Sequence, residues 1–408
     1  MKKIVILEVT FFRVLTIILQ LVFLKIYSNY LSIYELGLYY LFMTLSYSFN
    51  AIFLVPLDYF QQSKLYLLKN EKKSISSFLP INIFVFKVSV ILLVFIEIII
   101  YIIDSSFLLV GIILVLFALV SYANNLLRGF LNNFEYRRNA IYTLLVESTL
   151  KILLFWVAIQ FFSASSTLLF FTTTISMIII CLALILILIK KEEFKYTNRN
   201  CFKVIDIYHF SYPISFGAVI NWIQLQGYRI LLAPMGHIET IGLYATVANI
   251  GQTGMNAAST VYAQLFVPNI YKTNGEYTKK YIGFAILVIL FVLFVGMIFS
   301  ETLVVLLTSN KFAEYSYLIG YGILAESCNL IIGGLSIYLT IHNLTKKTII
   351  ASWIGLLSFV SVFFILYLID FLSVWTIGLP IVLSQLFVAI YLYYIVFFIY
   401  NIKDKSHE

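Results

Sequence analysis

The sequence predicts an all-α, polytopic integral membrane protein, with about twelve transmembrane helices in two six-helix lobes around a central cationic cavity. Three observations predict this class. Hydrophobic residues make up 62% of the 408 residues and charged residues only 11%, whereas a soluble domain carries about 25% charged residues. The apolar residues form runs long enough to cross a bilayer. The basic residues gather in alternate connections between those runs.

Twelve apolar segments approach or exceed the roughly 20 residues that a helix needs to cross the hydrocarbon core. A transmembrane β-barrel would instead show strands of about ten residues with alternating polarity, and runs such as 178–189 do not alternate. The first segment has the positive flank of a signal peptide, but no small-residue cleavage site follows, so we interpret it as a retained helix. The predicted spans lie near 4–27, 36–57, 78–103, 107–127, 139–162, 167–189, 210–233, 240–267, 281–307, 315–341, 349–369 and 374–400.

The distribution of lysine and arginine orients these helices. With a cytoplasmic N-terminus, the inner segments hold 21 of the 27 basic residues and the outer loops hold only Lys311. Cytoplasmic loops of membrane proteins carry such an excess. We therefore expect a multi-pass protein of the bacterial cytoplasmic (inner) membrane with both termini in the cytoplasm. The net charge of +8 then reflects this topology and anionic lipid headgroups, and indicates no nucleic-acid partner.

A polar stretch divides the chain into two halves. We predict an N-terminal six-helix lobe (1–189), a cytoplasmic linker (190–206) and a C-terminal six-helix lobe with a short cytoplasmic tail (207–408). An even number of helices per half gives both halves the same orientation, as in a parallel repeat. A short sequence pattern that occurs once in each half supports the repeat. In each half a basic residue is followed ten positions later by an acidic one and then by Gly-Leu-Tyr, at Lys25, Glu35 and 37–39 and at Arg229, Glu239 and 242–244.

The chain lacks the sequence patterns of common catalytic and metal-binding chemistry. Cys181, Cys201 and Cys328 are scattered and give neither a disulfide framework nor a metal-ligand spacing. No Walker A loop, HExxH or GxSxG pattern occurs. We therefore predict no catalytic residue, no metal and no cofactor, and interpret the chain as a membrane transporter rather than an enzyme. A proton or sodium gradient is left as the candidate energy source.

Charged residues inside the predicted spans are the main functional signal, because a charge at the bilayer centre costs about 2.5–3.5 kcal/mol on insertion scales and normally faces a cavity or a partner. Lys25 lies near a helix end and could equally snorkel to the interface. No acidic residue stands three or four positions from Arg13 or Arg229 in its helix. We expect these two to line a cavity, the alternative being a structural pair between helices. The five basic residues are Arg13, Lys25, Lys87, Lys151 and Arg229.

Two acidic residues are candidates for ion coupling. Glu147 and Lys151 are four residues apart on one helical face, which favours a structural ion pair over a coupling site. Glu147 and Glu326 nevertheless remain candidate coupling residues, because burial disfavours the charged form of a carboxylate and makes it a conceivable proton carrier.

Uncharged polar residues recur at helical spacing on three predicted helices, at Ser121, Asn124 or Asn125 and Arg128, at Asn221, Gln224 and Tyr228, and at Asn249, Gln252 and Asn256. Hydrogen bonds between helices, worth roughly 0.6–2 kcal/mol each, would explain one such stripe. Three stripes together with two intramembrane arginines better fit a wet, cationic cavity between the halves. The candidate substrate-binding residues are therefore Arg13, Lys25, Lys87, Arg128, Arg229, Asn124, Asn125, Asn221, Gln224, Asn249, Gln252 and Asn256.

Three passages resemble polysaccharide flippases of the Wzx type, namely 29–56, 126–142 and, most distinctly, 210–250. The last is similar to the family's pattern of a Pro-containing helix, a Trp, an Asp-Arg pair and a Gly-x-Tyr that opens the next helix. Tyr228 stands where the acid usually is, which puts acid-dependent coupling at that point in doubt. The segment 267–272 also resembles the end of the family's eighth helix. The matching residues are Pro213, Trp222, Arg229, Gly242 and Tyr244.

The resemblance implies a MATE-like fold, that of the multidrug/oligosaccharidyl-lipid/polysaccharide exporter superfamily. It implies translocation of undecaprenyl-diphosphate-linked oligosaccharide units, for O-antigen (lipopolysaccharide) or capsule, from the inner to the outer leaflet by alternating access. Arginine suits the diphosphate because its planar fork of donors matches phosphate geometry. The implied partners are membrane lipid, the lipid-linked substrate, and candidate polymerase and chain-length proteins of the same pathway.

Two other interpretations stay open. Another exporter of the same superfamily, for teichoic acid or a drug, fits the same observations. A membrane polysaccharide polymerase would also be polytopic and rich in aromatic residues. Such enzymes usually need a substantial outer loop or paired outer carboxylates, and the longest predicted outer stretch is only around 305–314.

Overall fold

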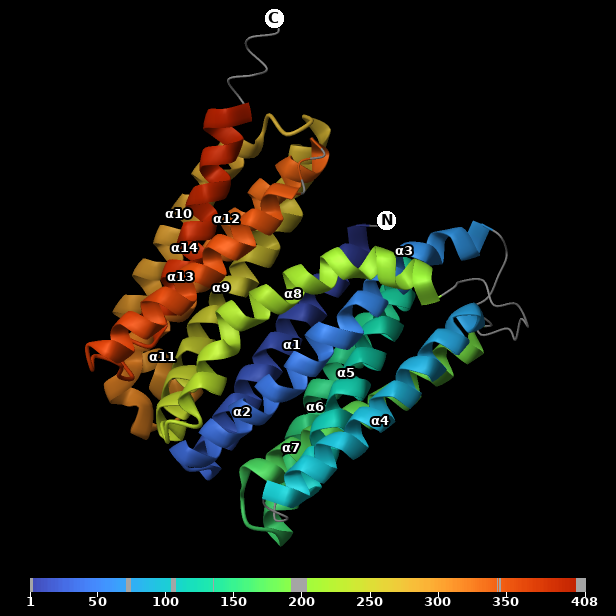
Figure 1. Cartoon of the computed structure of the whole chain (residues 1–408), viewed down its shortest axis with the longest axis vertical. Coiled ribbons are helices and arrows are strands. Elements are labelled where there is room, and N and C mark those ends of the chain that lie inside the picture. The colour runs from blue at the N-terminus through green and yellow to red at the C-terminus, as the bar shows by residue number, and fades with distance from the viewer. Residues whose placement is uncertain are drawn as a thin grey trace, which may run out of the picture. The chain divides into compact units, whose positions relative to one another are not determined.

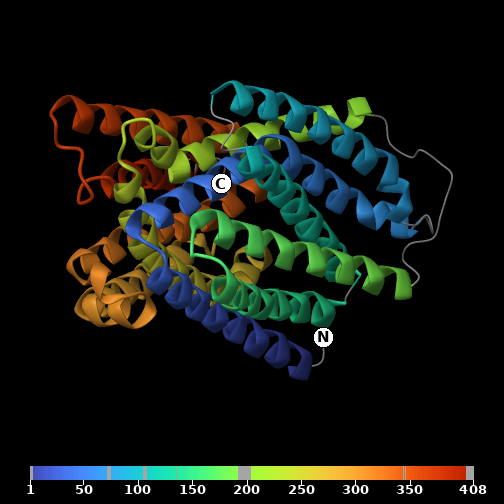
Figure 2. The same cartoon turned by 90° about the horizontal axis from the view of Figure 1, so that it is seen from below.

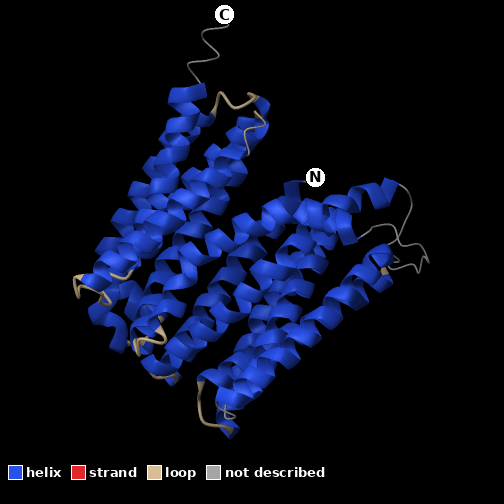
Figure 3. Cartoon of the chain, in the orientation of Figure 1, coloured by secondary structure: helices blue, strands red, loops and turns tan. Residues whose placement is uncertain are grey.

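The computed structural model describes residues 3–70, 75–103, 108–134, 136–191, 204–342, 344 and 346–400, and within these ranges the chain forms helices and no strand (Figure 3). The helices of the first half are α1 (Lys3–Tyr30), α2 (Ile33–Phe49), α3 (Val55–Asn70), α4 (Leu79–Ile103), α5 (Leu108–Asn133), α6 (Arg137–Phe161) and α7 (Ser166–Lys190). Those of the second half are α8 (Val204–Leu232), α9 (Ile238–Lys272), α10 (Thr278–Ile298), α11 (Ser300–Leu307), α12 (Ile319–Ile341), α13 (Lys346–Leu368) and α14 (Gly378–Tyr394). Figure 1 labels them along the chain.

Each of the twelve predicted spans coincides with a long helical segment, which confirms the all-α membrane fold class. Two segments are interrupted. The second passes through a π-helical turn, η1 (Asn50–Leu54), into α3 with a bend of 46°. The ninth breaks at Phe299, between α10 and α11. By length and composition, eight helices in the described ranges can cross a membrane, or nine if the bent pair is one span.

Local sequence explains where α7 begins and where α8 ends. Ser165 caps α7 because its hydroxyl accepts a hydrogen bond from the backbone N–H of Leu168. After α8 the chain turns through Pro234, which cannot continue a helix, and Gly236, whose φ of +81° favours glycine. Such caps satisfy the backbone groups that a helix end leaves without partners.

Packing divides the chain into two compact units. Unit 1 comprises Met1–Leu31 and Leu41–Val219, and unit 2 comprises Ser32–Tyr40 and Ile220–Glu408. In unit 1, α6 packs against α1 and α7, and α5 against α7 (Figure 2). In unit 2, α12 packs against α9, α10 and α14, and α13 against α14. The predicted lobe boundaries and the cavity between the lobes remain predictions.

Two pairs of glycines set close helix contacts in unit 2. A Cβ on Gly251 of α9 would overlap the backbone oxygen of Ile319, and one on Gly322 of α12 would overlap that of Ala248. Gly37 and Gly242 do the same where α2 and α9 begin. Small residues allow such close backbone approach between helices in membranes.

Candidate substrate-binding and coupling residues

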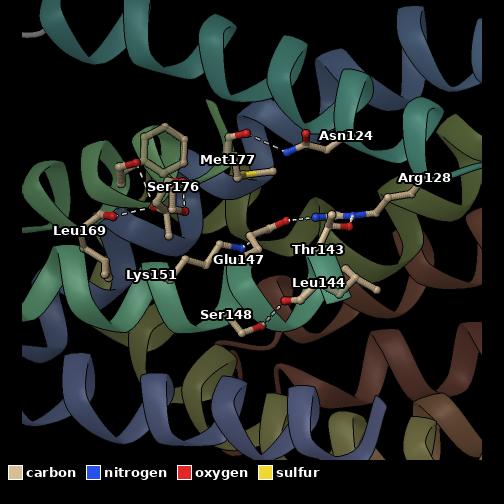
Figure 4. A network of polar contacts seen from close by, with 12 residues as sticks. Asn124, Arg128, Thr143, Leu144, Glu147, Ser148, Lys151, Leu169, Ser176 and Met177 are labelled. Carbon is tan, nitrogen blue, oxygen red and sulfur yellow. Dashed lines mark hydrogen bonds and ion pairs between the residues drawn. The ribbon is translucent and has the colours of Figure 1, made fainter. Parts of the chain in front are cut away.

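A buried cluster of three charged residues lies between α5 and α6 in unit 1 (Figure 4). Arg128 of α5 pairs through Nη2 with Oε2 of Glu147 on α6, and its Nε donates a hydrogen bond of 3.3 Å to Oγ1 of Thr143. The Nζ of Lys151 lies 2.6 Å from the other carboxylate oxygen, Oε1. The Arg128 and Glu147 side chains are only 10% and 8% exposed. With two cations on one carboxylate, the cluster carries a net positive charge.

The cluster confirms the predicted Glu147–Lys151 ion pair and adds a partner that the sequence did not indicate. Arg128 was predicted to bind substrate, yet it lies against Glu147, nineteen residues further along the chain. A proton on Glu147 would remove the charge that holds both cations, so the geometry favours a structural role for this carboxylate. The coupling role of Glu147 and the binding role of Arg128 stay predictions.

Asn124 and Asn125 lie on different faces of α5. Asn124 is fully buried, and its Nδ2 donates a 3.0 Å hydrogen bond to the backbone oxygen of Met177 on α7. Its Oδ1 is buried without a hydrogen-bond partner in the described part of the chain. Asn125 is exposed. Asn124 therefore links two helices, and Asn125 is the one of the pair that an external ligand could reach on unit 1 alone.

The other basic candidates of unit 1 lie outside this cluster. The side chains of Arg13 on α1 and Lys87 on α4 are exposed, and that of Lys25 is half-buried. Near the start of α1, Glu8 pairs with Arg138 at 2.7 Å and accepts a 2.6 Å hydrogen bond from the Tyr142 hydroxyl. These contacts join α1 to α6. The structure does not bring Arg13 and Lys87 together with Arg128.

Arg229 of α8 lies among tyrosines in unit 2. Its guanidinium carbon is 5.2 Å from the ring centre of Tyr40 and 5.3 Å from that of Tyr228. Its Nε also donates a 2.9 Å hydrogen bond to the Tyr228 hydroxyl. Tyr228 is 1% exposed and packs edge-on against Tyr244, with ring centres 5.2 Å apart. Tyr228, at the position where the resembled family has an acid, thus holds the guanidinium through cation–π and hydrogen-bond contacts and adds no formal charge.

Glu326 of α12 meets Gln252 of α9 at the glycine crossing of these helices. Oε2 of Glu326 accepts a 3.2 Å hydrogen bond from Nδ2 of Asn329, and Gln252 supplies a second side-chain hydrogen bond. Both partners are neutral amides, unlike the two cations around Glu147. The sequence predicted Gln252 for binding and Glu326 for coupling as separate features, and the tertiary structure places them in contact.

Gln224 joins helices of unit 2, and its predicted binding role stays a prediction. Its Nε2 donates a 2.8 Å hydrogen bond to the backbone oxygen of Ser352 on α13, and its Oε1 accepts a 3.0 Å hydrogen bond from Gln385 on α14. Gln224 is 2% exposed, and the nitrogen and oxygen of its amide together join α8, α13 and α14. Two further candidates, Asn221 and Asn256, are exposed and Asn249 is half-buried. Their binding roles stay predictions.

A neutral polar ring in unit 1 was missed by the sequence analysis. Gln61 of α3, Asn82 of α4 and Tyr122 of α5 exchange four hydrogen bonds of 2.7 to 3.0 Å. One helical turn before Gln61, Asp58 accepts a 2.7 Å hydrogen bond from Gln62. The predicted second span ends at residue 57, so Asp58 and Gln61 fall in a predicted connection, whereas Asn82 and Tyr122 lie within predicted spans. The useful signal was Pro56 followed by polar residues one turn apart, a pattern typical of a bent membrane helix.

Solved structures similar to this chain include transporters that share one fold. An outward-facing multidrug resistance MATE family transporter of the MOP superfamily has a TM-score of 0.66 and 15% identity, over 94% of this chain and 92% of that one. MATE in a bent conformation has a TM-score of 0.64 and 13% identity, over 99% and 96%. The lipid II flippase MurJ, in an inward closed conformation, has a TM-score of 0.64 and 15% identity, over 96% and 87%. No family model and no curated protein matches the chain.

These similarities extend over nearly the whole of each chain and show the MATE-like fold. The protein is an integral membrane protein with the architecture of MOP superfamily transporters. At identities of 13 to 17%, the likeness shows the fold alone.

Proposed function

We propose that this chain is a flippase that translocates undecaprenyl-diphosphate-linked oligosaccharide repeat units, of O-antigen or capsule, from the inner to the outer leaflet of the bacterial cytoplasmic membrane. Arg229 carries the proposal. A guanidinium held by tyrosine rings and a hydroxyl, inside a membrane-embedded helix bundle, offers a planar set of donors for a diphosphate.

Two further observations support a large anionic, lipid-linked cargo. Besides Arg229 in unit 2, the ion cluster around Glu147 in unit 1 carries a net positive charge, because two cations share one carboxylate. A lipid II flippase also stands among the structures with this fold. Such a cargo can keep its lipid chain in the bilayer while its polar part follows a cationic path, and alternating access would then move the two halves around that path.

We further propose that a proton or sodium gradient drives the transport and that Glu326 is the coupling group. Its two hydrogen-bond partners, Asn329 and Gln252, are neutral. The Glu326 carboxylate can therefore bind or release a cation without breaking an ion pair with either of them. Polymerase and chain-length proteins of the same pathway are the proposed partners, and both termini are proposed to be cytoplasmic.

Substitution of Arg229 in a flippase-deficient strain tests the function. Arg229→Ala should abolish surface polymer while the protein still inserts in normal amount, and Arg229→Lys should restore it only partly because lysine cannot present the planar fork. Arg13→Ala tests the other intramembrane arginine in the same way. Lys279→Ala, at an exposed position near the start of α10, is the matched control and should complement fully. Full complementation by Arg229→Ala would contradict the proposal.

The accumulated intermediate separates this function from its alternatives. A deletion strain should hold lipid-diphosphate-linked single repeat units at the cytoplasmic face, protected from enzymes supplied outside. A polymerase would instead leave single units that reach the cell surface unpolymerised. If the chain were a drug exporter, like the multidrug resistance MATE transporters that share this fold, its deletion would leave the polymer intact and raise drug sensitivity.

A further inference from the structure

An apolar groove runs over the surface of unit 2, between α10, α12 and the 3-10 helix η4 (Asn310–Leu318). It has a volume of about 680 Å³ and is lined by Leu293, Met297, Tyr317, Tyr321, Leu324 and Trp375. A second hollow of about 570 Å³ shares Leu293 and Met297 with it and extends along α10. Both helices that form the walls belong to segments long and apolar enough to cross a membrane. The groove therefore opens toward lipid hydrocarbon.

Aromatic rings stiffen one end of the groove. Trp375 stacks on Tyr315 and Tyr317, with ring centres 5.1 and 4.7 Å apart. The Tyr321 hydroxyl donates a 2.7 Å hydrogen bond to the backbone oxygen of Trp375. Because its hydroxyl is satisfied there, Tyr321 presents its ring to the groove. Flat, fixed rings make a wall against which a hydrocarbon chain can pack at little entropic cost.

A cation lies on the same element as this aromatic wall. Lys311, the only basic residue predicted on the outer side, is the second residue of η4, and its Nζ lies 5.3 Å from the ring centre of Phe312. A 3-10 helix rises about 2 Å per residue, so Lys311 lies about 12 Å from Tyr317 along the axis. Glu314, between them, is exposed. An apolar groove with a lysine at this distance fits an amphiphile with an anionic headgroup and a long chain.

Tyr321 also connects the groove to the Arg229 cluster. Its ring centre is 6.2 Å from that of Tyr244, which packs on Tyr228 beside Arg229. Successive ring contacts from Tyr321 through Tyr244 to Tyr228 thus connect the groove to the proposed diphosphate contact. This continuity favours the cargo lipid over bulk phospholipid as the occupant.

We propose that this groove binds the polyprenyl chain of the lipid-linked substrate, with the diphosphate directed toward Lys311 on the outer side of the membrane. The inference rests on the proposed function and on the predicted topology. The chain would occupy the groove at the end of translocation, when the polar part has reached the outer leaflet.

Native mass spectrometry of the purified full-length protein tests the groove. The protein is incubated with equal concentrations of undecaprenyl diphosphate and phosphatidylglycerol, and the wild type should retain undecaprenyl diphosphate preferentially. Leu324→Trp and Leu293→Trp fill the groove from opposite walls, and each should lower that retention by about fivefold or more. Leu287→Trp, at a position of α10 that is 62% exposed and outside the groove, is the control and should retain the lipid as the wild type does.

The outcomes separate the groove from the proposed function. Wild-type retention that persists in both groove variants would overturn the groove and leave the flippase function intact. Preferential retention of phosphatidylglycerol by the wild type would identify a phospholipid site and overturn the proposal. A variant that aggregates is replaced by Lys311→Gln, which should reduce the preference for undecaprenyl diphosphate over uncharged undecaprenol and should leave undecaprenol binding unchanged. An unchanged preference in Lys311→Gln would remove the lysine from the site and contradict the proposal.

Discussion

The backbone nitrogen of Gly37 lies 2.9 Å from the position that a Cβ on Gly242 would occupy. These are the glycines of the two Gly-Leu-Tyr patterns, so the repeated sequence marks a place where α2 and α9 touch backbone to backbone. The contact also explains why the patterns are alike, since each glycine must admit the backbone of the other helix. Both glycines belong to unit 2, which contains residues 32–40 as well as the second half of the chain from Ile220.

Gly242→Ala should therefore destabilise the protein. The added methyl group would overlap the backbone oxygen of Ile33, and overpacking of this kind costs about 1–3 kcal/mol. The check is the apparent melting temperature of the detergent-purified protein. Gly254→Ala on the same helix is the control, because a Cβ there meets no atom within 4 Å and alanine favours the helix by about 1 kcal/mol. Equal melting temperatures for the two variants would contradict the contact.

Glu147→Gln should destabilise unit 1 more than loss of either of its cationic partners. The substitution leaves Arg128 and Lys151 without their shared carboxylate, and breaking a buried ion pair costs about 3–5 kcal/mol. Arg128→Gln leaves Lys151 in place to pair with Glu147. Lys151→Gln should have the mildest effect, since the Lys151 side chain is 24% exposed and already meets solvent or headgroups. Thermal melting of the three variants gives the order, and an equal effect of all three would refute the cluster as a unit.

Tyr228 should act by positioning Arg229. Tyr228→Phe keeps the ring and removes one hydrogen bond, worth about 0.5–1.5 kcal/mol, so we expect a partial loss of surface polymer. Tyr228→Leu removes the ring as well and should abolish function at normal protein levels. Tyr271→Leu, at an exposed position near the end of α9, serves as the control for loss of a tyrosine. Full activity of the leucine variant at position 228 would exclude the positioning role.

Glu326→Gln should uncouple transport from the ion gradient. Glutamine keeps the shape of the side chain and an oxygen that can accept from Asn329, but it cannot exchange a proton or carry a charge. In proteoliposomes with an imposed proton or sodium gradient, the variant should bind substrate normally and show no gradient-dependent translocation. Glu301→Gln, on the exposed surface of α11, should respond as the wild type does. A gradient response that survives in Glu326→Gln would assign coupling to another group.

Single cysteines in a cysteine-free background test the topology. The basic residues predict that positions 164, 237 and 371 face outward and that positions 70 and 275 face the cytoplasm. A membrane-impermeant thiol reagent added to intact cells should label the first three and not the other two. Reversed labelling at two or more of these positions would overturn the predicted orientation, and with it the outer location of Lys311.

The sequence by itself determined the fold class, because the signal is local. A backbone in hydrocarbon must satisfy its own hydrogen bonds, so a run of about 20 apolar residues becomes a helix whatever surrounds it. Each predicted span could therefore be placed from its own residues. The Glu147–Lys151 pair was equally readable, since residues four apart share a helical face.

Only the tertiary structure decided what the polar groups do, because their partners lie on other helices. Arg128 and Gln224 have the same sequence signature as binding residues, yet Arg128 is drawn to Glu147 and Gln224 to Gln385. Glu326 and Gln252 meet because Gly251 and Gly322 let α9 and α12 approach closely. Helical periodicity predicts which residues share a face of a helix. The packing of the whole bundle determines which faces contact each other.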